Sequence, residues 1–233
     1  MSDRHVLITG ATRGLGRSLA EHYLAQGDTV IGCGRGSSPL SHERYLHTCV
    51  DVADDTAVKA LFGDLRHRLG RLDVLINNAG IASMNLMALT PIDVARRIME
   101  TNFLGTFLFT QGAVRLLRRS EHPRIVNVSS VAVPLSLEGE AVYAASKGAV
   151  ETFTRVTARE LGQWGITCNA VGPSPVRTDL TRNVSEQAMT RLIARQAVQR
   201  WAEPADVVNV VDFFLRPDSG LVTGQVVYLG GIA

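Results

Sequence analysis

Short apolar runs alternate with longer amphipathic segments along the whole chain. Several of the short runs lack alternating polar residues, which is typical of strands covered on both faces of a sheet. Strands are predicted at His5–Thr9, Thr29–Cys33, Tyr45–Val50, Asp73–Asn77, Arg124–Ser129, Ile166–Val171 and Gln225–Leu229.

The amphipathic segments between these runs predict helices. Gly27 and Gly70 follow two of them, at the position where a glycine commonly ends a helix. A third helix is expected to begin at "TPID", with Thr90 as its N-cap and Pro91 at the first helical position. The predicted helices cover Gly14–Gln26, Thr56–Leu69, Thr90–Leu117, Ala141–Leu161, Glu186–Ala197 and Ala205–Leu215.

This alternation predicts an α/β fold, a single Rossmann-type doubly wound parallel sheet of about seven strands flanked by helices on both faces. Such sheets bind ligands beyond the carboxyl ends of their strands. One catalytic domain is expected over residues 1–233, because single α/β domains often reach this length. The stretch 172–204 has no clear strand pattern, and we expect it to form a substrate lid within that domain.

Composition narrows the classes of function. Hydrophobic residues make up 45% of the chain, charged residues 20%, and the formal net charge is +2. This balance does not suggest nucleic-acid binding, and the basic group Arg115, Arg118 and Arg119 is interpreted as the solvated face of a helix. No apolar run approaches the roughly 18 residues that span a bilayer, so no membrane association is expected. The N-terminus has no signal-peptide pattern.

Three cysteines, Cys33, Cys49 and Cys168, lie in strand-like segments. An odd number without C-x-x-C spacing argues against a disulfide framework or a zinc site. We interpret all three as buried thiols in a reducing compartment, and therefore expect a cytoplasmic protein without a metal site.

The stretch "ITGATRGLGRS" joins the first predicted strand to the first helix. Its glycines, Gly10, Gly14 and Gly16, let the backbone turn sharply and approach a ligand closely. The N-terminus of the helix then offers free N–H groups and a positive dipole to a pyrophosphate. A glycine-rich turn without a ligand is the alternative for this motif alone.

The end of the second strand helps to choose the nucleotide. NAD-binding proteins usually carry an acidic residue there to hold the adenosine 2′-hydroxyl, whereas this chain has "GCGRG". Arg35 could pair with a 2′-phosphate, and Arg13 could close on it from the neighbouring loop. Either arginine alone would be an ordinary surface residue, but together they predict NADP(H). Asp51 either accepts from the adenine amino group or caps a turn or helix, and both alternatives stay open.

"AVYAASKGAV" places Tyr143 and Lys147 four residues apart, on one face of a helix. A free tyrosine has a pKa near 10, and a neighbouring ammonium would lower that pKa toward the range useful for proton transfer. Taken alone, the two residues would be interpreted as an ordinary surface pair.

Five motifs in one order resemble the short-chain dehydrogenase/reductase family. They are T-G-x-x-x-G-x-G at Thr9–Gly16, "NNAG" at Asn77–Gly80, Asn102 in "METNFLGTF", Ser130 thirteen residues before the tyrosine, and Y-x-x-x-K at Tyr143–Lys147. Each motif is weak alone, but the set is specific and the resemblance covers about residues 4–230.

The resemblance implies four catalytic residues. Tyr143 would act as the general acid in carbonyl reduction, and Lys147 would lower its pKa and hold the nicotinamide ribose. Ser130 would bind the substrate oxygen, while Ser129 is expected to be structural. Asn102 would anchor a water that links Lys147 to solvent.

It also implies an NADP(H) site. Asn78, Ala79 and Gly80 would line the cofactor channel, and Val176 and Thr178 would contact the nicotinamide carboxamide. The full expected set is Gly10, Thr12, Arg13, Gly14, Leu15, Gly16, Arg35, Asp51, Val52, Asn78, Ala79, Gly80, Tyr143, Lys147, Pro173, Val176 and Thr178.

Two stretches depart from the family pattern. Ser174 stands where a glycine is usual, and is expected to shift the backbone beside the nicotinamide or add a hydroxyl there. Val133, Pro134 and Leu135 are expected to reshape one wall of the substrate pocket.

Within the family, "RWAEPADVVNVVDFFL" and "SGLVTGQVVYLGG" most resemble 3-oxoacyl carrier-protein reductases of fatty-acid or polyketide synthesis. This implies a 3-oxoacyl thioester substrate on an acidic carrier protein. Arg124 matches an often basic position and could meet the carrier, whereas Trp164 replaces another. Arginines within the lid would favour an anionic or phosphopantetheine-linked substrate, or are simply solvated: Arg177, Arg182, Arg191, Arg195 and Arg200.

Two other functions stay open. One is a reductase or dehydrogenase of free small carbonyls, alcohols or sugars. The other is a non-catalytic NADP-binding sensor, against which the intact set of catalytic residues argues. The resemblance also implies a homotetramer or homodimer, which the apolar segments "NFLGTFLFT" and "AVETFTRVTA" permit.

Overall fold

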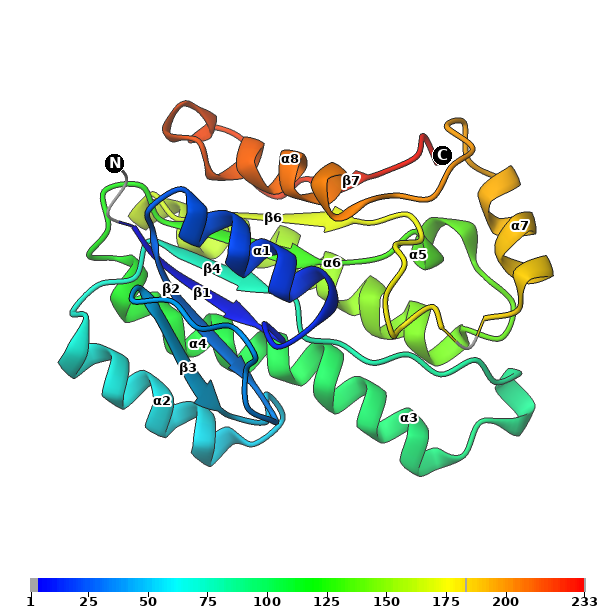
Figure 1. The fold of residues 1–233 in the computed structure, drawn as a ribbon, viewed down its shortest axis with the longest axis horizontal. Coiled ribbons are helices and arrows are strands. Elements are labelled where there is room, and N and C mark those ends of the chain that lie inside the picture. The colour runs from blue at the N-terminus through cyan, green and yellow to red at the C-terminus, as the bar shows by residue number, and fades with distance from the viewer. Residues whose placement is uncertain (1–3, 183, 233) are drawn as a thin grey trace.

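A parallel sheet of seven strands, in the order β3-β2-β1-β4-β5-β6-β7, forms the centre of the molecule (Figure 1). The computed structural model describes residues 4–182 and 184–232. The strands are β1 (His5–Thr9), β2 (Thr29–Gly34), β3 (Tyr45–Cys49), β4 (Val74–Asn77), β5 (Arg124–Val128), β6 (Thr167–Gly172) and β7 (Val226–Tyr228). The predicted fold class is confirmed, and the strand order reverses between β1 and β4, where such sheets bind their ligands.

Helices cover both faces of this sheet. The first and last long helices, α1 (Gly14–Ala25) and α8 (Pro204–Leu215), share one face. The opposite face is covered by α2 (Asp55–Arg68), α4 (Gly105–Leu117) and α6 (Ala141–Leu161). The remaining helical elements are η1 (Met87–Leu89), α3 (Ile92–Met99), η2 (Glu100–Leu104), α5 (Ala132–Leu135), η3 (Gly162–Trp164), α7 (Glu186–Ala194) and η4 (Pro217–Ser219).

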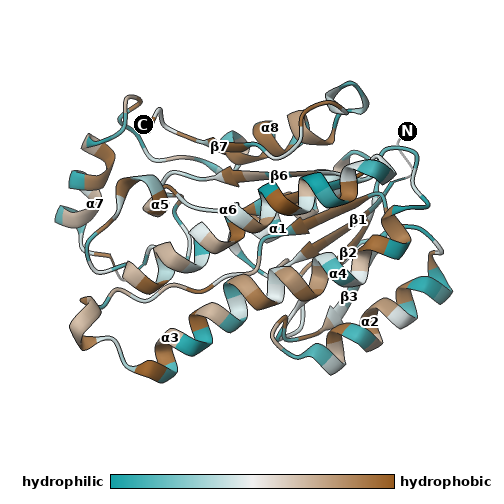
Figure 2. Cartoon of the chain, turned by 180° about the vertical axis from the view of Figure 1, so that it is seen from behind, coloured by the Kyte–Doolittle hydropathy of each residue, from teal (hydrophilic) through white to brown (hydrophobic). Residues whose placement is uncertain are grey.

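The two apolar layers follow from the period of two in the strands. In β1, Val6 and Ile8 pack toward α1 and α8, whereas Leu7 between them packs toward α2 and α4. Figure 2 shows the strands in the middle of the sheet mostly in brown, because they carry apolar residues on both faces. Such strands could be predicted from their lack of polar alternation.

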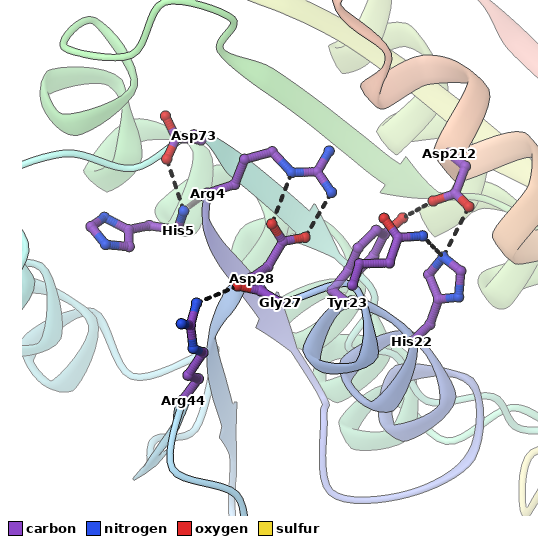
Figure 3. Close-up of polar contacts among 10 residues, drawn as sticks. Arg4, His5, His22, Tyr23, Gly27, Asp28, Arg44, Asp73 and Asp212 are labelled. Atoms are coloured by element: carbon purple, nitrogen blue, oxygen red, sulfur yellow. Dashed lines mark hydrogen bonds and ion pairs between the residues drawn. The ribbon is translucent and has the colours of Figure 1, made fainter. Parts of the chain in front are cut away.

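A polar network holds the amino ends of the strands (Figure 3). The Arg4 guanidinium donates to both carboxylate oxygens of Asp28, at 3.1 and 2.6 Å, and Asp28 is fully buried. Tyr23 donates to Asp212 of α8 at 2.9 Å, and a ring nitrogen of His22 lies 2.9 Å from the same carboxylate. These contacts join the starts of β1 and β2 and link α1 to α8. They lie at the end of the sheet opposite the glycine loop, so we expect them to stabilise the fold.

The third predicted helix is interrupted in the structure. It begins at Ile92 with Pro91 at the N-cap, and the Thr90 hydroxyl instead donates to the Leu86 carbonyl at 3.1 Å, so the predicted cap is wrong. Between α3 and α4, η2 is a π-helical turn that contains Asn102. Apolar periodicity did not indicate this turn, because a π turn inserts one residue into a pattern that otherwise continues.

The cysteine prediction is partly wrong. Cys33 and Cys168 are buried, but Cys49 is exposed. Cys49 ends β3, which lies at the edge of the sheet, so one side of that strand has no neighbour to cover it.

No helix within 4–182 and 184–232 is long and apolar enough to cross a membrane.

Candidate active site

A cavity of about 940 Å³ lies at the carboxyl ends of the strands. Its walls come from the glycine loop after β1, the ends of β2, β4, β5 and β6, the start of α6, and parts of residues 173–195. The helices α5 and α7 stand at this end of the molecule (Figure 1). This is the place where a doubly wound sheet is expected to bind its ligand.

The glycine loop exposes bare backbone to the cavity. Gly10 has a φ of +68° and its N–H donates to the Cys33 carbonyl at 2.8 Å, which turns the chain sharply out of β1. A Cβ at Gly16 would overlap the carbonyl oxygen of Gly10, so only glycine fits there. Asn78 supports the turn from β4, because its Nδ2 donates to the Thr9 carbonyl at 2.9 Å. This cradle fits the pyrophosphate of a dinucleotide.

The residues expected to bind the cofactor all line the cavity: Gly10, Thr12, Arg13, Gly14, Leu15, Gly16, Arg35, Asp51, Val52, Asn78, Ala79, Gly80, Tyr143, Lys147, Pro173, Val176 and Thr178. Asp51 also accepts from the Ala53 N–H at 3.0 Å, so it closes a turn while it faces the cavity. Both alternatives for Asp51 therefore remain compatible with its position.

Arg13 has a partner that the sequence did not suggest. Its guanidinium lies 3.2 Å from the carboxylate of Asp179, in the stretch expected to form the lid. The Arg13 side chain is 69% exposed and that of Asp179 38%, so the pair contributes little stability. Arg13 can therefore exchange this partner for a phosphate at small energetic cost.

Tyr143 is buried at the first turns of α6. Burial raises the pKa of the Tyr143 phenol to about 12, a hydrogen bond with Ser130 lowers it, and the charge of Glu140 raises it. The phenol therefore holds its proton at neutral pH. Ser130 follows β5 and also accepts from the Ala132 N–H at 3.1 Å, which fixes its hydroxyl in the cavity wall.

Lys147 does not act on the tyrosine as the sequence suggested. Its ammonium donates to the Val128 carbonyl at 2.8 Å and lies 6.0 Å from the centre of the Tyr143 ring. Burial lowers the pKa of Lys147 to about 8. The predicted lowering of the Tyr143 pKa is wrong for this structure, because burial of the phenol dominates.

Asn102 is fully buried in η2 and its side chain is bonded on every side. Its Oδ1 accepts from the Ile81 N–H, and its Nδ2 donates to the Ile81 carbonyl, both at 2.9 Å. Nδ2 also donates to Ser146 of α6 at 3.0 Å. The π turn thus ties the loop after β4 to the catalytic helix. The water-anchoring role of Asn102 stays a prediction.

The far end of the cavity differs from the expected substrate pocket. Val131 and Leu137, on either side of this stretch, line the cavity, whereas residues 133–135 are absent from the lining, so that prediction is wrong. The short helix α5 turns these residues away, and the Leu135 carbonyl accepts from Arg195 at 3.1 Å. Arg195 itself lines the cavity together with Arg191 of α7.

Glu140 is a cavity residue that the sequence reasoning missed. It lies at the N-cap of α6, is half-buried, and has no side-chain hydrogen bond or ion pair among the described residues. Burial raises the pKa of its carboxyl group. An acidic residue one helical turn before Tyr143 was the available signal. A carboxyl group without a partner beside the reacting tyrosine is well placed to bind a polar part of the substrate.

Ser174 supplies the extra hydroxyl that its replacement of glycine predicted. The hydroxyl donates to the Leu229 carbonyl at 2.8 Å, which ties the segment after β6 to the residue after β7. Ser174 is buried and its residue still lines the cavity.

Arg124 cannot meet a carrier protein, so that expectation is wrong. Its side chain is buried at the start of β5 and donates to the carbonyls of Pro123, Arg216 and Pro217 at 3.1 to 3.2 Å. Trp164 is partly exposed, and the Cζ atom of Arg118 lies 4.5 Å from the centre of its ring.

No group of three or more His, Cys, Asp or Glu residues within the described ranges is arranged to hold a metal ion.

A family model described as short chain dehydrogenase matches residues 4–189. The chain belongs to the short-chain dehydrogenase family. Two relatives of this short-chain dehydrogenase are 3-oxoacyl-[acyl-carrier-protein] reductases FabG. The one from Vibrio cholerae is 31% identical over 97% of this chain and 95% of its own. The one from Staphylococcus aureus is 32% identical over 98% of this chain and 97% of its own.

A solved structure resembles this short-chain dehydrogenase closely. The ligand-free aldohexose dehydrogenase of Thermoplasma acidophilum superposes with a TM-score of 0.90 at 29% identity, over 99% of this chain and 94% of that one. The family membership makes the chain an oxidoreductase that acts on CH–OH or C=O groups and binds a nicotinamide cofactor.

Proposed function

We propose that this short-chain dehydrogenase is an NADPH-dependent ketone reductase whose substrate is a 3-oxoacyl thioester on a carrier protein, of the fatty-acid or polyketide type. The observation that carries the proposal is the convergence of Ser130, Tyr143 and Lys147 on one wall of a cavity that continues to Arg191 and Arg195. These two guanidiniums would suit the phosphate of a phosphopantetheine arm. The two FabG relatives support the same substrate class.

The residues of the chain would divide the chemistry between them. The reduced nicotinamide would supply the hydride. Ser130 holds the carbonyl oxygen, and Tyr143, which is protonated at neutral pH, gives its proton to that oxygen. Lys147, whose ammonium donates to the Val128 carbonyl and lies 6.0 Å from the centre of the Tyr143 ring, would hold the ribose. The glycine cradle and Asn78 would hold the pyrophosphate.

Arg13→Ala and Arg35→Ala are each expected to raise the KM for NADPH by about tenfold or more, because each removes a charged hydrogen bond to the 2′-phosphate. The KM for NADH should stay unchanged. Steady-state kinetics with both cofactors measures the difference. Arg17→Ala is the matched control, since Arg17 pairs with Glu21 on the exposed side of α1. An equal loss for both cofactors would make Arg13 and Arg35 ordinary surface residues.

Three further properties belong to the same proposal. The protein is a cytoplasmic homotetramer or homodimer, and residues 172–204 act as a substrate lid. Exposed Leu104, Phe107 and Val156 on the long helical segments support the assembly. The contributions of residues 173–195 to the cavity wall support the lid.

Glu140 favours a second candidate, the reduction of free hydroxylated carbonyls or oxidation of sugars. A carboxylate beside Tyr143 would accept hydrogen bonds from sugar hydroxyls, and the superposed Thermoplasma enzyme is an aldohexose dehydrogenase. A thioester carbonyl, which only accepts hydrogen bonds, would gain nothing from an ionised Glu140.

A substrate panel with wild type and Glu140→Gln separates the two candidates. For a carrier-linked 3-oxoacyl substrate, kcat/KM should exceed that for free ketones and sugars, and Glu140→Gln should preserve or raise it. For a sugar, Glu140→Gln should lower kcat/KM by about tenfold, because a charged acceptor is lost. A rate on acetoacetyl carrier protein no better than on a free ketone would remove the thioester proposal.

A further inference from the structure

Three successive residues at the end of β5 are bonded to three turns of α6. The Val128 carbonyl accepts from Lys147 at 2.8 Å, and the Ser129 hydroxyl donates to Glu151 at 2.6 Å. Ser130 is hydrogen-bonded to Tyr143. Two of these contacts involve residues assigned to the reaction. The middle one, between Ser129 and Glu151, does not.

Glu151 is a buried carboxylate with a complete set of partners. Its side chain is 4% exposed, and the same oxygen, Oε1, accepts from Ser129 and from the Tyr228 hydroxyl, each at 2.6 Å. Its other oxygen lies 3.7 Å from the Arg155 guanidinium. Hydrogen bonds to a carboxylate at this distance are roughly twice as strong as neutral ones. The carboxylate therefore joins α6, the end of β5 and the edge strand β7 at one point.

We propose that Glu151 is a positioning residue, which through Ser129 fixes the place of the Ser130 hydroxyl relative to Tyr143. Glu151 touches neither Ser130 nor Tyr143. Ser129 transmits its effect, because the Ser129 N–H donates to the Val171 carbonyl of β6 at 2.7 Å while its hydroxyl is held by Glu151. With both ends held, the next peptide, and with it Ser130, has one orientation.

The Ser129–Glu151 contact differs from the neighbouring contact between Lys147 and Val128, because only the latter involves a residue proposed to bind the cofactor. Lys147 is the residue proposed to hold the cofactor ribose, so the three donors of its ammonium would be divided between Val128 and the cofactor. The partners of Glu151 are protein side chains, Ser129, Tyr228 and Arg155, so its bond to Ser129 keeps β5 against α6 throughout the reaction. Tyr228 adds rigidity, because its ring covers Gly172 so closely that a Cβ there would overlap it.

This inference rests on the proposed roles of Ser130 and Tyr143, and Ser129→Ala tests it with little change in volume. The variant is expected to lower kcat by about tenfold or more, since small misplacements in an active site have effects of that size. The KM for NADPH should stay within about twofold, because the substitution removes no contact that binds the cofactor equally in the ground state and the transition state. The apparent pKa of Tyr143 in the pH profile of kcat should rise, as the bond from Ser130 that lowers it is weakened.

Two variants accompany Ser129→Ala. Glu151→Gln should retain most of the activity, because an amide oxygen still accepts from Ser129 and Tyr228. Ser120→Ala is the matched control. It removes a serine-to-carboxylate bond, from Ser120 to Asp73 at 2.5 Å, and should lower thermal stability while leaving kcat and its pH profile unchanged.

Two results would overturn the positioning role. One is a Ser129→Ala protein that melts lower, as Ser120→Ala does, but keeps the wild-type kcat and pH profile. The other is a Glu151→Gln protein as impaired as Ser129→Ala, since the charge rather than the geometry would then matter. Tyr143→Phe is measured in the same assay. If it stays fully active, the proposed function itself fails, which is a distinct outcome.

Discussion

Replacement of Tyr143 by phenylalanine is expected to lower kcat for ketone reduction by about 10²- to 10⁴-fold, the usual contribution of a positioned general acid. The phenol is the buried O–H donor that lies next to Ser130 in the cavity. Lys147 does not replace it, because its ammonium is directed to the Val128 carbonyl. NADPH oxidation with a ketone substrate measures the loss.

Binding and folding controls make this result specific. NADPH affinity, followed by the fluorescence of the reduced nicotinamide, should remain close to that of wild type. Tyr45→Phe is a suitable comparison, because it removes a mostly buried phenol hydroxyl from β3, outside the cavity lining, and should leave kcat unchanged. Full activity of Tyr143→Phe would contradict the catalytic assignment.

Replacement of Arg4 by alanine is expected to lower the free energy of unfolding by about 3 kcal/mol, the lower end of the range for breaking a buried ion pair by removing one partner. The lower end applies because the Arg4 side chain is 27% exposed, whereas its partner Asp28 is fully buried. The variant leaves the Asp28 carboxylate in the protein interior without its guanidinium. Urea unfolding at neutral pH measures the difference.

The expected loss depends on burial rather than on the number of ion pairs. Arg216→Ala breaks an exposed pair with Asp218 and should change the free energy of unfolding by at most about 1 kcal/mol. Arg4→Ala combined with Asp28→Asn should recover part of the loss, because no charge is then buried. A destabilisation by Arg4→Ala as small as that by Arg216→Ala would contradict this account.

The sheet could be predicted from the sequence because its strands are buried on both faces and its helices have strong end signals. Gly27, for example, has the positive φ expected of a residue that follows a helix. Edge effects could not be predicted, since the exposure of Cys49 depends on the position of β3 in the strand order. The π turn around Asn102 leaves the apolar pattern almost unchanged, so it was also missed.

In the site, local motifs were informative and long-range contacts were not. The glycine loop and the Tyr143–Lys147 pair were brought to one cavity as expected. The partners that set their behaviour come from distant segments. Lys147 is held by Val128, and the burial of Arg124 depends on carbonyls more than ninety positions away. Glu140 lay beside a recognised motif, but its lack of a partner is a property of the folded chain.

The unequal exposure of the three cysteines makes this protein ready for fluorescent labelling without any mutation. Burial raises the pKa of the Cys33 and Cys168 thiols to about 12, so neither forms the thiolate that reacts with a maleimide at neutral pH. Cys49 is open to solvent and stands two positions before Asp51, a cavity residue for which contact with the adenine is proposed. A dye attached to Cys49 would report nucleotide binding near Asp51 directly.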